Sequence, residues 1–279
     1  MRYGLNSNDH KVEFNKVKDI LNFALDNNVN LLDTAPSYGN SELVLGGAAV
    51  QDFNIITKTR CFSKKFIEKK DVDALVNDLS QSLQLLKREN IYGLLVHNAD
   101  DLLKPGSEKI FQQLNRFKQQ GLVSKVGVSV YTENQIQEII DRFDIDLIQL
   151  PFNIIDWRLV GTGILNKVYS KGIEIHARSV FLQGLLLMER GRIPKKFDRW
   201  DNLWRVWDEW LNDNKITALE ATIRYAISTH EIKKVLVGVD SKRQLQEIVT
   251  SSKGHLPDIP KELFMSDINL LNPSNWSNL

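Results

Sequence analysis

Cysteine is nearly absent from this chain, which has Cys61 as its one cysteine in 279 residues. A single cysteine excludes a disulfide within the chain and is typical of proteins kept in a reducing compartment, so we expect a cytoplasmic protein. We interpret Cys61 as a small, half-buried apolar residue. No group of His and Cys residues has the spacing of a metal site, and we expect no metal.

Long hydrophobic runs and blocks of like charge are also missing. The most apolar stretch, residues 180–188, contains Gln183 and is too short to span a bilayer, and no cleavable signal is recognisable. The 36 basic and 35 acidic residues give a net charge of +1, which disfavours a nucleic-acid surface. With 42% hydrophobic and 25% charged residues, the composition is that of a globular protein. We therefore expect neither a membrane nor a nucleic acid as partner.

Short apolar runs alternate with amphipathic helical patterns along the whole chain, which is typical of parallel strands joined by helical crossovers. Strands are predicted at 29–33, 53–58, 91–96, 123–130, 145–150, 173–178 and 234–238. Helices are predicted at 12–27, 41–49, 72–86, 110–119, 133–142, 161–170, 216–228 and 244–250. Four tryptophans spaced for one helix face indicate a packing surface: Trp200, Trp204, Trp207 and Trp210.

Polar residues gather where the predicted strands end, as they do in a (β/α)8 TIM barrel. A doubly wound sheet is the second possibility, but it would want a G-x-G-x-x-G fingerprint after an early strand, and none occurs. We therefore predict an α/β protein, a single barrel domain over residues 1–279.

The predicted barrel is one strand short. Seven strand segments are present, and the mostly polar stretch before the first helix offers only Met1–Leu5. At roughly 3.3 Å per residue, this segment is too short for a barrel strand and its loop. We expect barrel strand one to be missing or truncated, as a start codon read too far downstream would produce. The 29–33 and 234–238 strands would then face each other without pairing.

Three neighbouring strands end on ionisable residues. Asp33 ends the first predicted strand, Lys58 the second, and His97 follows the third. Tyr38 lies in the loop after Asp33, which Pro36 and Gly39 break. Each residue alone is more often structural, but together they can face one cleft.

These residues resemble the catalytic tetrad of the aldo-keto reductase family. The match begins with Asp33-Thr34-Ala35 and Tyr38-Gly39-Asn40-Ser41-Glu42, followed by Lys58 and His97. It continues over nearly the whole chain through Gly127-Val128-Ser129, Gln149, Ala177-Arg178-Ser179, Gln183-Gly184, Gly238 and Gln244 to Glu247. The segment 177–186 is similar to a bacterial subgroup associated with surface-polysaccharide pathways.

The resemblance implies an enzyme that reduces an aldehyde or ketone with NADPH or NADH. Tyr38 would donate the proton, and Lys58, held by Asp33, would stabilise the phenolate. His97 would orient the carbonyl oxygen and stabilise its developing charge. The expected substrate is a small carbonyl compound, sugar derivatives included. The sequence indicates no oligomeric state and no single substrate.

The resemblance also assigns cofactor contacts. Ser129 and Gln149 would bind the nicotinamide carboxamide, and Arg178 occupies the place of an aromatic residue that stacks on the nicotinamide in many members. The ribose and pyrophosphate would contact Ser179, Gln183 and Gly184, and the adenosine end would contact Gly238, Asp240, Gln244 and Glu247.

Asp240 departs from the family pattern, because many members hold the adenosine 2′-phosphate there with Ser, Lys or Arg. A carboxylate repels a phosphate and accepts a hydrogen bond from a 2′-hydroxyl. Lys242 and Arg243 act in the opposite direction. We expect a weaker preference for NADPH than the family shows, or use of both cofactors.

Two other functions remain open from the sequence. The missing strand favours a reductase-like binding or regulatory protein without efficient turnover. A sugar-binding barrel without redox activity would need Lys58 or Tyr38 to point away from the cleft. The intact tetrad favours the enzyme.

Overall fold

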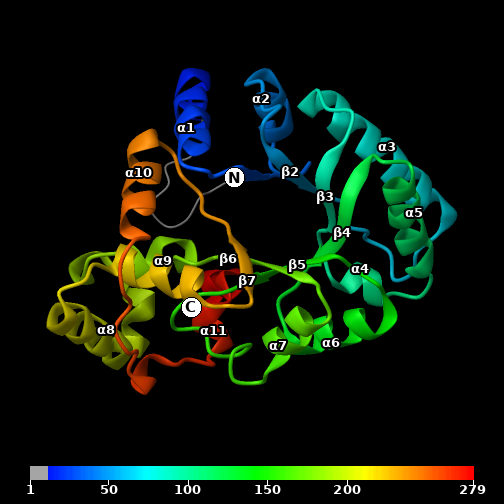
Figure 1. Cartoon of the computed structure of the whole chain (residues 1–279). Helices are drawn as coiled ribbons and strands as arrows, with labels where there is room; N and C mark the ends of the chain where they lie inside the picture. The colour runs from blue at the N-terminus through cyan, green and yellow to red at the C-terminus, as the bar shows by residue number, and fades with distance from the viewer. Residues whose placement is uncertain (1–11) are drawn as a thin grey trace.

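A parallel sheet of seven strands forms the centre of the computed structural model, which describes residues 12–279 (Figure 1). The strands lie in sequence order, each parallel to the next. They are β1 (Leu31–Asp33), β2 (Asn54–Lys58), β3 (Ile91–Val96), β4 (Val123–Ser129), β5 (Leu147–Pro151), β6 (Glu174–Arg178) and β7 (Ile232–Val235). The sheet curls with helices outside it, so residues 12–279 form an incomplete (β/α)8 barrel of seven strands, as predicted.

The sheet is open between β1 and β7. Within residues 12–279, β1 pairs only with β2, and β7 only with β6. The expected gap between these two strands is therefore present in the described part of the chain, whereas Met1–Leu5 lies outside it. The helical layer is continuous at this place, because α1 (Phe14–Asp26) packs against α10 (Lys242–Ser251).

Most of the remaining helices lie outside the sheet. These remaining helices are α2 (Ser41–Gly47), α3 (Lys69–Leu86), α4 (Asp100–Leu103), α5 (Glu108–Gln119), α6 (Glu133–Arg142), α7 (Ile164–Ser170), α8 (Asp201–Asn214), α9 (Ala218–Ser228) and α11 (Ile268–Leu271). Helices α8 and α11 pack against 3-10 turns of the chain. Side-chain caps define several starts: Thr132, Thr217 and Ser241 each accept a hydrogen bond from the backbone N–H three residues on. Helix α3 begins at Lys69, three residues before the prediction, because Glu68 and Asp71 form a capping box.

Some boundaries differ from the sequence prediction. Strand β7 begins at Ile232 and ends at Val235, so Gly238 lies beyond it. Leu236 still donates its N–H to the Ala177 carbonyl at 2.8 Å, after which the chain leaves the sheet.

Cys61 is exposed, whereas the sequence predicted a half-buried residue. The irregular stretch after β6 holds three 3-10 helices: η1 (Leu182–Leu187), η2 (Arg190–Arg192) and η3 (Lys195–Trp200).

The tryptophan stripe forms a packing face, as predicted. All four indoles are buried, and those of Trp200 and Trp210 join η3 and α8 to the C-terminal segment. The Trp200 indole N–H donates to Asp267 Oδ2 at 3.1 Å, and that of Trp210 donates to the Asp258 carbonyl at 2.9 Å. Two short 3-10 turns, η4 (Lys261–Leu263) and η5 (Pro273–Asn278), belong to this segment.

Inside the curled sheet, side chains lie in layers. Ile56, Leu95 and Leu147 form an apolar cluster separate from the core under the helices, as alternation along each strand requires. Below it, towards the strand starts, Glu174 accepts a hydrogen bond from the Tyr92 hydroxyl at 2.7 Å and pairs with Lys125 at 2.7 Å. The polar residues at the strand ends therefore rest on a packed interior.

Candidate active site

The first three strands bring their terminal charged residues together. Lys58 Nζ donates to Asp33 Oδ2 at 2.6 Å and to the Thr34 carbonyl at 3.0 Å. The register explains this contact, because β1 and β2 are parallel neighbours whose carboxyl ends meet at one edge of the sheet. Lys58 is only 2% exposed, so its ammonium is removed from water and depends on these partners.

Tyr38 and His97 stand beside this ion pair. The Tyr38 ring centroid lies 5.0 Å from Lys58 Nζ. The Tyr38 and His97 rings meet edge to face, with centroids 5.9 Å apart and planes at 81°. Both residues are half-buried, unlike Lys58, so a molecule entering from solvent can reach them. The structure thus groups the four residues that the sequence singled out.

Local contacts hold the Tyr38 loop against β2. The Tyr38 N–H donates to the Ala35 carbonyl at 2.9 Å, and Gly39 adopts a φ of +65°, where a residue with a Cβ is disfavoured. At the start of α2, the buried Glu42 carboxylate accepts a hydrogen bond from the Thr57 hydroxyl at 2.6 Å. Because Thr57 precedes Lys58, this bond fixes the loop relative to the lysine. This supporting role of Glu42 was not predicted from the sequence.

Burial and charge shift two pKa values in the group. Burial lowers the pKa of Lys58, the Asp33 carboxylate opposes this shift, and the Arg178 guanidinium adds to it. Burial likewise lowers the pKa of His97, and Lys58 and Arg178 reinforce the effect. Since an ordinary histidine has a pKa near 6.5, the His97 imidazole is mainly neutral at pH 7. A neutral imidazole can donate one N–H to a carbonyl oxygen.

Asp33 has a second partner that the sequence analysis did not anticipate. Gln149 Nε2 donates to Asp33 Oδ1 at 2.8 Å, so both carboxylate oxygens are engaged. Gln149 lies opposite Ser129 in the β4–β5 register, and both side chains are buried. The two residues predicted for a carboxamide are therefore adjacent, and Gln149 also links β5 to the Lys58 ion pair.

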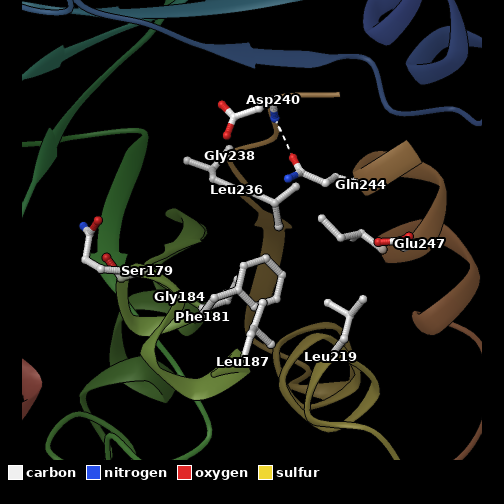
Figure 2. Close-up of a pocket in the computed structure, with 14 residues that line it drawn as sticks. Ser179, Phe181, Gly184, Leu187, Leu219, Leu236, Gly238, Asp240, Gln244 and Glu247 are labelled. Atoms are coloured by element: carbon white, nitrogen blue, oxygen red, sulfur yellow. Dashed lines mark hydrogen bonds between the residues drawn. The ribbon is translucent and has the colours of Figure 1, made fainter. Parts of the chain in front are cut away.

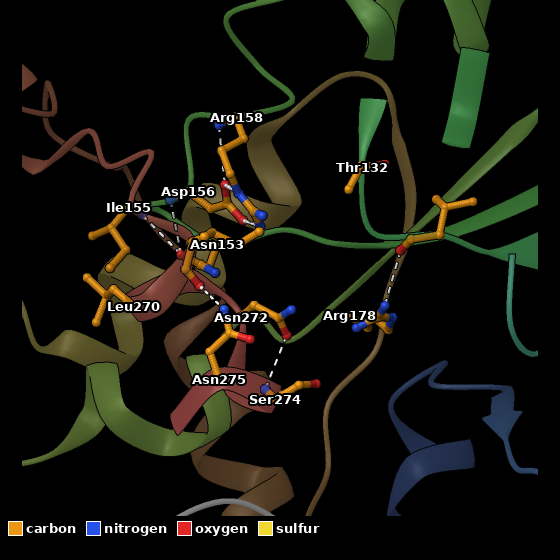
Figure 3. Close-up of polar contacts among 12 residues, drawn as sticks. Thr132, Asn153, Ile155, Asp156, Arg158, Arg178, Leu270, Asn272, Ser274 and Asn275 are labelled. Carbon is orange, nitrogen blue, oxygen red and sulfur yellow. Dashed lines mark hydrogen bonds and ion pairs between the residues drawn. The ribbon is translucent and has the colours of Figure 1, made fainter. Parts of the chain in front are cut away.

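Arg178 is the last residue of β6. Its Nη2 donates to the Val130 carbonyl at 3.1 Å (Figure 3). Its guanidinium lies 4.2 Å from the Tyr131 ring centroid. Both contacts are with the β4–α6 connection. Arg178 is thereby held near Lys58 and His97, whose pKa values it lowers.

The loop that follows β5 is held in shape by the side chain of Asn153. Asn153 Oδ1 accepts from the N–H groups of Ile155 and Asp156, at 3.3 and 3.1 Å (Figure 3). Asp156 in turn binds the Arg158 guanidinium through both carboxylate oxygens, at 2.8 and 2.6 Å. These bonds make the loop an ordered support beside the strand ends.

A cavity of about 420 Å³ lies beyond Arg178, between the loop after β6 and the start of α10. Figure 2 shows Phe181, Leu187 and Leu219 on one side of it and Asp240 with Gln244 on another. Its lining includes seven residues that the sequence analysis assigned to a dinucleotide: Ser179, Gln183, Gly184, Gly238, Asp240, Gln244 and Glu247. The sequence did not predict that Phe181, Leu187 and Leu219 would line a cavity, because apolar residues in such segments usually belong to the core.

The backbone around this cavity adopts uncommon conformations. Ser179, Leu182 and Gln183 have φ values of 61°, 46° and 54°, and Gly184 has 85°. Non-glycine residues rarely occupy this left-handed region, and such strain concentrates at ligand-binding segments. The run places main-chain groups along the cavity, where they can contact a ligand closely.

Two other kinds of site are not found in the described chain. Among residues 12–279, no group of three or more His, Cys, Asp or Glu side chains is placed to hold a metal ion. No helix of that range is long and apolar enough to cross a membrane.

Comparisons with known proteins agree with this geometry. The family model described as the Aldo/keto reductase family matches residues 1–259. An uncharacterized oxidoreductase of Bacillus subtilis (strain 168), YqkF, is 23% identical over 261 residues, covering 86% of this chain and 83% of that protein.

Solved structures share the fold. The aldo-keto reductase AKR11C1 from Bacillus halodurans, in its holo form, superposes with a TM-score of 0.72 at 21% identity, covering 89% of this chain and 85% of that one. The glycerol dehydrogenase AKR11B4 from Gluconobacter oxydans gives 0.70 at 20% identity, covering 88% and 82%. Because the family match spans nearly the whole sequence, this chain belongs to the aldo/keto reductase family.

Proposed function

We propose that the protein reduces an aldehyde or ketone to an alcohol with a nicotinamide dinucleotide, NADPH or NADH, and with Tyr38 as the proton donor. One observation carries the proposal: the buried Lys58 ammonium is paired with Asp33 at 2.6 Å and lies 5.0 Å from the Tyr38 ring. A phenol with a pKa near 10 gives up its proton reluctantly at neutral pH. A cation fixed beside it stabilises the phenolate and makes the transfer easier.

The other residues have distinct roles in the proposal. Asp33 holds Lys58 in place and limits the loss of its proton, which burial favours. His97 donates an N–H to the carbonyl oxygen and stabilises the charge that develops there. Gln149 keeps Asp33 oriented through its amide N–H. The proton moves from the Tyr38 hydroxyl to the former carbonyl oxygen.

The residues present fit a dinucleotide. The cavity of about 420 Å³ begins next to the tetrad. Arg178 lies close enough to His97 to lower its pKa, and the following residue, Ser179, lines the cavity. In the proposal, Ser129, Gln149 and Arg178 hold the nicotinamide end. Ser179, Gln183 and Gly184 hold the ribose and pyrophosphate, and Gly238, Asp240, Gln244 and Glu247 hold the adenosine. When bound, the reduced nicotinamide supplies the hydride, which no side chain can supply.

The substrate class follows from this chemistry and from one relative. A small carbonyl compound, sugar derivatives included, suits an opening lined by half-buried Tyr38 and His97. The structural relative named glycerol dehydrogenase supports a polyol or its carbonyl counterpart as a first compound to try.

Replacing the phenol tests the proposal. Tyr38→Phe should lower kcat by about 10²–10⁴-fold, the usual contribution of general acid catalysis. The dissociation constant for the reduced dinucleotide should stay within about threefold, because the phenol contacts the transition state and not the cofactor. Tyr169→Phe, an exposed tyrosine on α7, is the matched control. Turnover by Tyr38→Phe at the wild-type rate would refute the assignment.

A further inference from the structure

The charged residues around the cavity bear on whether it binds a nucleotide with a 2′-phosphate. Two carboxylates line it, those of Asp240 and Glu247, and Figure 2 shows them on different sides of the space. Among the described residues of the lining, none is a lysine, arginine or histidine. A phosphate monoester carries about −1.5 to −2 charges at pH 7, and beside Asp240 it would face a carboxylate with no basic residue in the described lining.

Neither of the two nearby basic residues pairs with Asp240: Lys242 lies over a ring of α1, and Arg243 pairs with the other lining carboxylate, Glu247. Lys242 Nζ lies 5.7 Å from the ring centroid of Phe23 on α1, and Lys242 is not part of the cavity lining. Arg243 Nε pairs with Glu247 Oε1 at 3.4 Å, and its side chain is 86% exposed. From the sequence, both cations favoured a 2′-phosphate, but in the structure neither forms an ion pair with Asp240, so the Asp240 charge is not neutralised by them.

The backbone groups that often bind phosphate at a helix start are also occupied. The Asp240 N–H donates to Gln244 Oε1 at 2.7 Å, and the Gln244 N–H donates to Ser241 Oγ at 3.3 Å. A phosphate at the start of α10 would have to displace these internal bonds. Asp240 itself is half-buried, so its charge is less screened than that of an exposed carboxylate.

We propose that this cavity selects NADH over NADPH, with Asp240 as the specificity residue that accepts a hydrogen bond from the adenosine 2′-hydroxyl. A neutral hydroxyl donates to a carboxylate, whereas a phosphate in its place would be repelled. The inference rests on the proposed function only in that a dinucleotide occupies the cavity.

Direct binding tests the inference without turnover. Titration by fluorescence or calorimetry should give a dissociation constant at least about tenfold lower for NADH than for NADPH, as expected for repulsion between close charges. AMP and adenosine 2′,5′-bisphosphate, which differ only in the 2′-phosphate, should show the same order, which locates the discrimination at the adenosine end. Because Asp240 is only half-buried, salt still screens part of its repulsion of a phosphate, and the ratio of the two dissociation constants should move towards one as salt rises.

Asp240→Asn keeps the shape of the residue and removes its charge. It should narrow the NADH to NADPH ratio by about fivefold or more, mainly through tighter NADPH binding. Asp52→Asn, an exposed acidic residue outside the cavity, should leave the ratio unchanged. Equal or tighter binding of NADPH by the wild-type protein, or an unchanged ratio in Asp240→Asn, would overturn the specificity alone. Failure of every nucleotide to bind would overturn the proposed function as well.

Discussion

Replacing Asp33 with asparagine should show what the Asp33–Lys58 ion pair contributes apart from the rest of the fold. The amide has nearly the same shape but no charge, and its NH₂ group must face either the Lys58 ammonium or the Gln149 amide, both of which donate to Asp33 now. One of the two bonds therefore becomes a contact between donors. We expect the variant to fold with a barrel like that of the wild type and to lose most of its turnover.

The size of the expected loss of turnover follows from the burial of Lys58, which is 2% exposed. Removing one partner of a buried ion pair costs about 3–5 kcal/mol if the remaining charge stays in place. The lysine can avoid this cost by releasing its proton, because burial and Arg178 already lower its pKa. Either way the Tyr38 phenolate loses a fixed cation, and kcat should fall by about 10²–10⁴-fold.

The assay is kcat as a function of pH, measured together with thermal unfolding. Since the loss of Asp33 lowers the Lys58 pKa further, any residual activity should disappear at a lower pH on the alkaline side than in the wild type. Asp146→Asn breaks a different ion pair, with Lys118 at 2.7 Å, and should affect stability without affecting kcat. A kcat for Asp33→Asn within about threefold of the wild-type value would refute the reasoning, since a lost general-acid partner is worth far more.

Two further predictions concern stability. Gly46→Ala would place a Cβ 2.0 Å from the Leu85 carbonyl oxygen at the α2–α3 contact and should destabilise the fold by about 3 kcal/mol or more, measured by denaturant unfolding. Its neighbour Gly47→Ala meets no backbone atom and should be neutral or stabilising by up to about 1 kcal/mol; equal effects would contradict the packing argument. Burial lowers the pKa of His176 to about 4 in the folded protein, against about 6.5 in the unfolded chain. The free energy of unfolding should therefore be unaffected by this histidine above pH 6.5 and should decrease as the pH falls from 6.5 towards 4, because the unfolded chain binds the proton first. At 1.36 kcal/mol per pKa unit, the decrease in the free energy of unfolding amounts to roughly 3 kcal/mol. His176→Leu should abolish this decrease between pH 6.5 and pH 4, as measured by denaturant unfolding at each pH.

Much of the site was predictable because its residues follow strand ends. Apolar strands of five or six residues stand out in sequence, and parallel strands all end at one edge, so Lys58 and His97 could be placed together with Asp33. The seven strands and the gap between β1 and β7 followed from the same count. Helix ends were less predictable, because the capping box of α3 and the early end of β7 depend on local hydrogen bonds.

What the sequence determined by itself is the order of elements and the chemistry at the strand ends, because hydrophobic periodicity and residue type are local properties. Only the tertiary structure decided which partners those groups have. Gln149 reaches Asp33 across 116 positions of sequence, and the Lys242 ammonium lies over a ring of α1 instead of in the cavity. Such contacts depend on side-chain direction and on the closure of the helical layer, and no local pattern encodes either. The charge of the cavity, and with it the expected choice of cofactor, therefore became visible only in three dimensions.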